Sequence, residues 1–452
     1  MRMCRARRQP PYVRAVQVRR RAAARVLRRL GLVATSFVLS AVTVLPWAAP
    51  ESRALPPSAA DAGTALWRRT GIAAARYRVW DGGAFTPVQP TAAAGEWRVI
   101  QGAASLTRPE VIVAGVKTDG SISGEMWSGT GWAALPFNDL ARVSESNWWS
   151  AAVAYEASSG DAMLVWANGT TGSTPLSYRV WNGSTWTAAA TITTPLSGEA
   201  LQLRLAAAPR SDEMVLVVSN SSSRDYALVW DGSSWGSAVS LDSSGNNDDH
   251  SDIAVAYLQQ SSAAVVVYGR DAASPYFRTW NGFAWSGELA IAAPGASGSA
   301  RWLTLATLPD GDALALGVLT FDNEAWFAVF GGGSWGNTVL ASTATAGEIF
   351  PGVAVAFESA SGEVLATYAE ANSRFRYRTW AAGVGWSARR DGADLGANPN
   401  SMTLEPRRDS DQVMLAVQDD NSDLHYTLWN GTAWGSQTEV ETDTGEVRNQ
   451  PF

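Results

Sequence analysis

The sequence predicts an all-β protein, a β-propeller of eight four-stranded blades of about 50 residues each. Three observations predict this fold. An aromatic–turn–aromatic motif recurs eight times, each repeat contains short strand-like runs without a convincing helix, and a second, longer period lies inside the first. A four-stranded unit of this size buries its sheet faces only against neighbouring units, so a series of such units is expected to close into a ring.

The first period is set by aromatic residues that precede a tight turn, and consecutive copies are 47 to 54 residues apart. The residues are Trp80, Trp127, Trp181, Trp230, Trp280, Phe330, Trp380 and Trp429. Asn-Gly or Asp-Gly follows in five of the copies, and these pairs favour two-residue type I′ hairpin turns. For the turn at 182–183 we therefore expect Trp181 opposite Ser184 and Trp186 opposite Arg179.

With this register, both tryptophans of a hairpin lie on one sheet face. The favoured interpretation is packing between blades, with Arg179 stacked on the indoles, because the pattern recurs in every repeat. The alternative is a platform for sugars between blades.

The second period distinguishes two blade types that alternate along the chain. One type contains the runs Ala152–Tyr155, Ala254–Tyr257 and Ala354–Phe357; the other contains Leu203–Pro209, Leu303–Pro309 and Met402–Pro406. Alternating types close into a ring without a mismatch only when their number is even. The sequence therefore favours eight blades over seven.

The propeller is expected to span residues 63–452. The first repeat starts near Gly63 at a second strand, so its first strand is missing. Residues 449–452 align with 349–352, where a first strand begins, and we expect the C-terminus to complete the first blade. The alternative is a chain that continues into a ninth repeat.

Residues 1–54 are expected to be a signal peptide, and 55–62 a short linker. Eleven arginines between Arg2 and Arg29 precede an apolar run at 30–45, which is shorter than the roughly 20 residues of a membrane span. Arg28 and Arg29 permit twin-arginine export, and general secretion is the other route. We expect a secreted, periplasmic or cell-surface protein; the alternative is an uncleaved N-terminal anchor, which is the one membrane attachment considered.

The charge distribution argues against nucleic acid as a partner. The chain has a formal net charge of −7, with 35 basic and 42 acidic residues, and the leader holds 12 of the basic residues and one acid. Residues 55–452 therefore carry a net charge of −18, which repels phosphate backbones. The single cysteine, Cys4, lies in the leader, so the exported chain has no disulfide and no thiol ligand.

Aromatic residues near the starts of first strands are the predicted ligand site. Trp148, His250 and Phe350 occupy equivalent positions in three repeats, and Trp149 and Trp302 lie nearby. The longer loops fall on the same side of the ring, and long loops on a rigid frame are common binding sites. We predict an aromatic mouth around the central channel; hydrophobic plugging is the alternative.

The sequence predicts no cofactor, with calcium as the less favoured interpretation. The acidic runs 246–252 and 419–423 offer oxygen ligands but lack the glycine and distal glutamate of an EF-hand, and Asp and Asn are common in turns. Catalysis is also disfavoured. His250 and His425 are the only histidines, and neither accompanies a nucleophile motif.

The repeats resemble secreted bacterial β-propeller proteins. Blade length and Trp content are similar to those of sugar-binding propeller lectins, and the run 231–235, Asp-Gly-Ser-Ser-Trp, is similar to the Asp-box of sialidase-type propellers, Ser-x-Asp-x-Gly-x-x-Trp. It lacks the leading Ser and is one residue shorter, so no catalytic residue is carried over. The resemblance implies a binding module for glycans or a surface protein. A sialidase-like hydrolase or lyase, and a protein-docking scaffold, are the alternatives; the sequence sets no oligomeric state.

Overall fold

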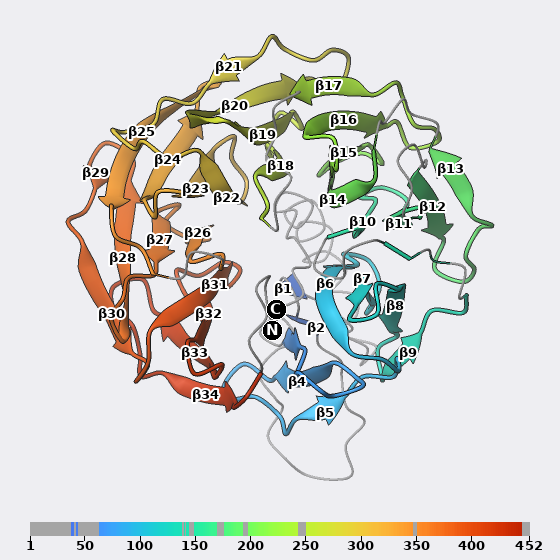
Figure 1. Ribbon diagram of the computed structural model, residues 1–452, viewed down its shortest axis with the longest axis horizontal. Helices are drawn as coiled ribbons and strands as arrows, with labels where there is room; N and C mark the ends of the chain where they lie inside the picture. The colour runs from blue at the N-terminus through green and yellow to red at the C-terminus, as the bar shows by residue number, and fades with distance from the viewer. Residues whose placement is uncertain are drawn as a thin grey trace, which may run out of the picture.

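The predicted eight-bladed propeller is confirmed. The computed structural model describes residues 38–39, 42–43, 63–137, 140, 142–143, 149–169, 176–192, 198–242, 250–346 and 350–444. These residues form strands and turns, without a helix. Figure 1 shows the sheets as blades around a central axis, and the chain passes once around the ring. Within each blade, consecutive strands are antiparallel neighbours, ordered from the axis outward.

The first four blades contain 15 strands. Blade 1 consists of β3 (Gly63–Trp67), β4 (Arg76–Trp80) and β5 (Gln89–Pro90). Blade 2 consists of β6 (Trp97–Ala104), β7 (Val111–Lys117), β8 (Ile122–Trp127) and β9 (Trp132–Ala134). Blade 3 consists of β10 (Ala151–Tyr155), β11 (Ala162–Ala167), β12 (Leu176–Trp181) and β13 (Ala190–Ile192). Blade 4 consists of β14 (Ala200–Ala207), β15 (Met214–Asn220), β16 (Arg224–Trp230) and β17 (Val239–Asp242).

The second half repeats this plan. Blade 5 consists of β18 (Ile253–Tyr257), β19 (Ala264–Arg270), β20 (Ala272–Trp280) and β21 (Leu289–Ala290). Blade 6 consists of β22 (Ala300–Thr307), β23 (Leu314–Thr320), β24 (Ala325–Gly331) and β25 (Ser334–Ser342). Blade 7 consists of β26 (Val353–Phe357), β27 (Val364–Tyr368), β28 (Arg374–Ala381), β29 (Gly385–Trp386) and β30 (Arg390–Asp394). Blade 8 consists of β31 (Pro399–Pro406), β32 (Val413–Asp419), β33 (Leu424–Trp429) and β34 (Thr438–Glu441).

Two short strands, β1 (Val38–Leu39) and β2 (Val42–Thr43), pair antiparallel within the apolar run of the expected leader. The rest of residues 1–62 lies outside the described residues. The signal peptide, the linker and the cleavage after residue 54 therefore stay predictions.

The inner strands are apolar because neighbouring blades cover both faces of each sheet. In β11, all six residues from Ala162 to Ala167 are buried. Between blades, Tyr178 of blade 3 lies 5.7 Å from Trp230 and 6.2 Å from Trp235 of blade 4, measured between ring centroids. The same arrangement recurs from Tyr77, Phe277 and Tyr377 of the other odd-numbered blades, and Phe327 of blade 6 and Tyr426 of blade 8 also contact hairpin aromatics of the next blade. The interpretation of the hairpin aromatics as packing between blades is thus confirmed, whereas the Arg179 guanidinium lies 4.5 Å from the ring of Phe137 and not on the hairpin indoles as expected.

The predicted two-residue turn is wrong. Trp181 pairs directly with Trp186, so the loop between them has four residues. Asn182 Oδ1 accepts the N–H groups of Ser184 at 3.0 Å and Thr185 at 2.8 Å, and Gly183 alone in this loop has a positive φ, 89°. The Asn-Gly pair therefore supplies a side-chain acceptor and one left-handed residue, whereas a type I′ turn needs two residues at positive φ.

Blade 8 packs against blade 1 and closes the ring. Tyr426 lies 5.6 Å from Trp80 and 5.1 Å from Phe85 between ring centroids. Arg69 lies 3.8 Å from Glu441 and 3.5 Å from Asp443. Residues 445–452 lie outside the described residues, so the contribution of the C-terminus to blade 1 stays a prediction.

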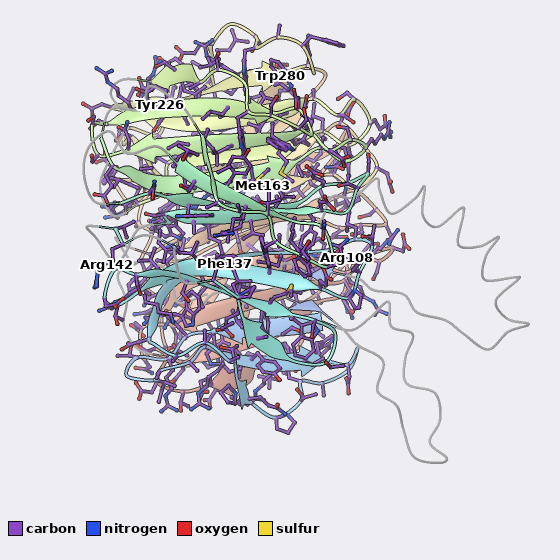
Figure 2. All side chains as sticks on the ribbon, turned by 90° about the vertical axis from the view of Figure 1, so that its right-hand side faces the viewer. Arg108, Phe137, Arg142, Met163, Tyr226 and Trp280 are labelled. Atoms are coloured by element: carbon purple, nitrogen blue, oxygen red, sulfur yellow. The ribbon has the colours of Figure 1, made fainter. Side chains whose placement is uncertain are left out.

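The two faces of the ring carry different loops. Figure 2 shows the ring from the side, with Arg108, in the turn between β6 and β7, on one face and Arg142, in the connection from blade 2 to blade 3, on the other. We call the first the hairpin face, because the Trp hairpins lie there too, and the second the loop face. First strands therefore run from the loop face to the hairpin face.

Candidate functional site

A cavity of about 180 Å³ lies on the axis of the ring. It is lined by the first strands of blades 2 to 8, and most of its wall consists of small or aliphatic side chains such as Ala152, Ala206 and Ala254. These alanines belong to the runs that define the second period, and their small size leaves the axis open. The residues that define the second period therefore also line the cavity.

The even-numbered blades each contribute one polar residue to the cavity wall at the same register. These residues are Gln101, Arg204, Thr304 and Thr403, which we call the polar ring. Each pairs with the fourth residue of the adjacent second strand, respectively Ala114, Val217, Gly317 and Ala416. The odd-numbered blades line the same cavity mainly with apolar residues. The wall thus alternates between polar and apolar groups around the axis.

Arg204 and Gln101 connect several blades at this level. The Gln101 Nε2 atom donates to Ala151 O at 2.7 Å and to Leu203 O at 3.3 Å. Arg204 donates to Ser251 Oγ at 2.6 Å and to Leu203 O at 3.2 Å, and its guanidinium lies 5.3 Å from the ring of Trp149. Because Gln101, Arg204 and these partners come from blades 2 to 5, the packing of consecutive blades holds the guanidinium in one orientation.

Three of the five residues predicted to form the mouth come together near the loop face. Trp149 and Trp302 meet edge to face at 5.4 Å between ring centroids, and His250 lies 5.6 Å from Trp302 and 5.2 Å from Phe321. Trp149, Trp302 and His250 are exposed by 0%, 2% and 9%. Their ring faces pack mainly on one another, and Trp302 also lines the cavity. We call Trp149, His250, Trp302 and Phe321 the aromatic plug.

Of the other two predicted residues, only Phe350 is described, and no ring contact joins it to this cluster. Phe350 is half-buried just before β26, and Trp148 lies outside the described residues. A ligand-binding role for all five residues stays a prediction. The polar ring was missed, although a signal was present: Gln101, Arg204, Thr304 and Thr403 each follow Ile, Leu or Met at one position of the second period.

Burial and the positive charge of Arg301 lower the pKa of His250 to about 4. At neutral pH the imidazole in the aromatic plug is therefore uncharged, which suits its packing against Trp302 and Phe321. The plug contributes no titrating charge to the cavity near physiological pH.

Buried glutamates near the hairpin face bond to indoles of the next blade. Glu156 accepts Trp230 Nε1 at 2.8 Å, and Glu358 accepts Trp429 Nε1 at 2.8 Å. Burial raises the pKa of Glu156, and it raises the pKa of Glu358 to about 7. Raised pKa values of this kind occur in catalytic acids. The same Glu–Trp bond recurs in two pairs of blades, which indicates a structural role. In blade 5 the equivalent residue is Leu258, and there the partner indole is replaced by Phe330, which has no N–H group.

Replacing Glu358 with glutamine is expected to remove part of the pH dependence of stability. The pKa of Glu358 is raised, so the folded protein binds the proton more tightly, and stability falls as the pH rises from about 4.5 through about 7. Glu358→Gln keeps an oxygen acceptor for Trp429 without ionising. We expect the variant to be more stable than the wild type by about 1–2 kcal/mol at pH 8, with the gain lost at pH 4.5.

Urea unfolding at the two pH values measures this difference. Glu439→Gln, at an exposed position of β34, is the control for the loss of one carboxylate. Equal effects of Glu358→Gln at both pH values would contradict the assignment.

A second polar cluster lies in blade 8. Ligand atoms of Asp419, Asp423 and His425 lie within 4.8 Å of one another. Asp419 Oδ1 accepts the N–H groups of Asn421 and Asp423 at 3.0 and 2.9 Å, and His425 lies between Asp419 Oδ2 and Gln437 Oε1, at 3.0 Å from each. These hydrogen bonds explain why the polar side chains of Asp419 and His425 lie together. Calcium binding stays a prediction, and 246–249 of the other acidic run lie outside the described residues.

In the part of the chain that the structure describes, no helix meets the length and apolarity required to cross a membrane.

The sequence matches no protein-family profile and no curated protein. Among solved structures, the BP39L lectin from Burkholderia pseudomallei aligns with a TM-score of 0.52 at 13% identity, over 76% of this chain and 99% of the lectin. A complex of a mutant lectin from Aleuria aurantia with Fucα1-6GlcNAc aligns with a TM-score of 0.40 at 14% identity, over 74% of this chain and 92% of that one. The first of these likenesses shows a shared β-propeller fold.

Proposed function

We propose that the protein is an exported, lectin-like β-propeller that binds a glycan through its central cavity. The observation that carries the proposal is the polar ring, which shares one cavity with apolar residues of the odd-numbered blades. Sugars present hydroxyl groups, which need donors and acceptors, and C–H faces, which pack on apolar surface. The BP39L lectin, which shares the fold over 99% of its length, supports a glycan as the partner.

The placement of the titratable groups favours binding over catalysis. Glu156 and Glu358 have raised pKa values, but neither lines the cavity, and each bonds to an indole of the next blade. His250 lies in the aromatic plug, and His425 bonds to Asp419 in blade 8. The cavity wall itself carries no carboxylate among the described residues. A pair of acids that could hydrolyse a glycosidic bond there is therefore not part of the proposal.

A glycan array with the purified protein tests the proposal, and we expect saturable binding of defined glycans. Thr304→Val and Thr403→Val remove hydroxyl groups of the polar ring at nearly constant shape. Each is expected to weaken binding of the best glycan about five- to tenfold, the worth of roughly one hydrogen bond.

Thr367→Val is the matched control. Thr367 is fully buried in β27, its Oγ1 has no hydrogen-bond partner among the described residues, and it does not line the cavity. Binding that is unaffected by both ring variants would place the glycan elsewhere. The absence of any glycan binding would contradict the proposed function.

A further inference from the structure

We infer that the central cavity selects a monosaccharide unit that carries a carboxylate, and that Arg204 binds this group. The inference rests on the proposed function and specifies its ligand class, since a uronic or sialic acid unit has both the hydroxyl groups and the negative charge that the cavity wall matches.

The charge of the cavity wall is the first argument. Arg204 is the one charged residue among the described residues that line it, and the wall has no Asp, Glu or Lys. This contrasts with residues 55–452 as a whole, which carry many more acids than bases. Placing a cation in a narrow cavity is costly unless polar groups or an opposite charge compensate it. A neutral sugar does not require it, whereas a carboxylate gains a charge-assisted bond of about twice the usual strength.

The orientation of Arg204 is the second argument. Its guanidinium is held by Ser251 Oγ at 2.6 Å and by Leu203 O at 3.2 Å, and it lies over Trp149 at 5.3 Å. A guanidinium is planar and offers donors in a fixed fork, which suits a carboxylate in particular. Because three neighbours fix its plane before a ligand arrives, little side-chain entropy is lost on binding.

The remaining wall provides partners for hydroxyl groups. Thr304 Oγ1 and Trp302 Nε1 are buried and have no hydrogen-bond partner among the described residues, and both residues line the cavity. Gln101 lies in the same ring, with its Oε1 3.4 Å from Arg204. Buried polar atoms are nearly always paired in proteins, and a ligand hydroxyl group that reached these two atoms after a side-chain rotation would pair them.

The size of the cavity limits the occupant to a single ring. Its volume of about 180 Å³ is below the roughly 300 Å³ at which pockets for drug-sized ligands begin. A longer glycan would therefore place one terminal unit at the polar ring, with the rest of the chain outside the cavity.

Calorimetric titration with paired ligands tests the inference. The probes are D-galacturonate, D-glucuronate and N-acetylneuraminate, each compared with its methyl ester, and the neutral sugars galactose and fucose. The ester removes the ligand charge without a change in the protein, so the comparison does not depend on the folding of a variant. We expect at least one acid to bind about tenfold or more tightly than its ester.

Arg204→Gln provides the matching change in the protein. It is expected to abolish the preference for the acid over the ester, while Arg204→Lys retains part of it. The control is Arg378→Gln, because Arg378 is a half-buried arginine of β28 that bonds to Ser387 O at 2.7 Å and does not line the cavity. Thermal melting of each variant separates a loss of binding from a loss of fold.

The outcomes distinguish the inference from the proposed function. Acid-selective binding that Arg204→Gln abolishes supports both. Equal binding of acid, ester and neutral sugars, unchanged in Arg204→Gln, overturns the inference and leaves the glycan-binding function standing. If neither the acids nor any glycan of the array binds, the proposed function itself is wrong.

Discussion

Replacement of Glu213 with alanine is expected to lower the free energy of unfolding by about 3 kcal/mol, because it leaves the buried Tyr257 hydroxyl and the half-buried Trp280 indole without an acceptor. Glu213 Oε1 accepts the Tyr257 hydroxyl at 2.9 Å, and Oε2 accepts Trp280 Nε1 at 3.0 Å. Both donors belong to the next blade, and Tyr257 is exposed by only 2%. The carboxylate therefore joins blade 4 to blade 5.

Blades 6 and 7 lack both the acceptor and the donor of this pair at the equivalent positions. In blade 6 the position of Glu213 is taken by Ala313, and in blade 7 the position of Tyr257 is taken by Phe357, which has no hydroxyl group. The double variant Glu213→Ala with Tyr257→Phe copies this pair. We expect it to recover at least about 1 kcal/mol relative to the sum of the single changes, since it removes donor and acceptor together.

A double-mutant cycle, measured by urea unfolding and thermal melting, determines this coupling. Glu439→Ala, at an exposed position of β34, serves as the control for loss of a surface carboxylate and is expected to change stability by less than about 0.5 kcal/mol. Strict additivity of Glu213→Ala and Tyr257→Phe would show that the two side chains do not stabilise the blade interface jointly.

Replacement of Arg270 with methionine is expected to cost about 3 kcal/mol at pH 7, the lower end for a buried ion pair, because Asp242 is buried whereas the Arg270 side chain is 25% exposed. Arg270 lies 2.9 Å from Asp242 and 2.5 Å from Glu288, and the Asp242 side chain is exposed by only 4%. Burial raises the pKa of Asp225 well above its usual range, and the neighbouring Asp252 and Asp242 raise it further, whereas Arg270 opposes them. Without the arginine, several acids face one another inside the protein.

The loss should depend on pH in a defined direction. Removing the cation raises the pKa values of the acids around it, so the variant is destabilised most where they are ionised. Its stability should approach that of the wild type as the pH falls and the acids become protonated. Urea unfolding at pH 7 and pH 4.5 measures the difference, and an equal loss at both values would contradict this account.

Blade 7 offers the matched control, because the same positions carry the opposite charges there. Glu370 replaces Arg270, Arg389 replaces Glu288, and the two lie 3.3 Å apart. Arg389 is half exposed, and Glu370 keeps a second bond to Arg376 at 3.0 Å. Arg389→Met is therefore expected to cost less than about 1 kcal/mol.

Much of the fold could be predicted because the information is local and repeated. Each blade encodes its own strands by short apolar runs, and five of the eight hairpins carry an Asn-Gly or Asp-Gly pair, so the copies reinforce one another. The detail that failed was the loop length at Asn182. Its side-chain oxygen closes a four-residue loop, and the dipeptide Asn-Gly occurs both there and in two-residue turns.

The candidate site could be predicted only in part. Equivalence among repeats placed Trp149, His250 and Trp302 near one end of the channel, where the structure brings them together. It did not determine that these rings bury one another, because that requires side chains from blades 3, 5 and 6 to meet across the axis. Their separation along the chain gives no signal of such a contact.

The number of blades, their alternation and the packing of hairpin aromatics between neighbours follow from the sequence, because these depend on contacts within a repeat or between successive repeats. The surroundings of the axis depend on how the whole ring folds. Gln101, Arg204, Thr304 and Thr403 lie about 100 residues apart along the chain and line one cavity because the ring closes. A closed ring brings equivalent positions of distant repeats together, and this convergence produces both the polar ring and the single cation within it.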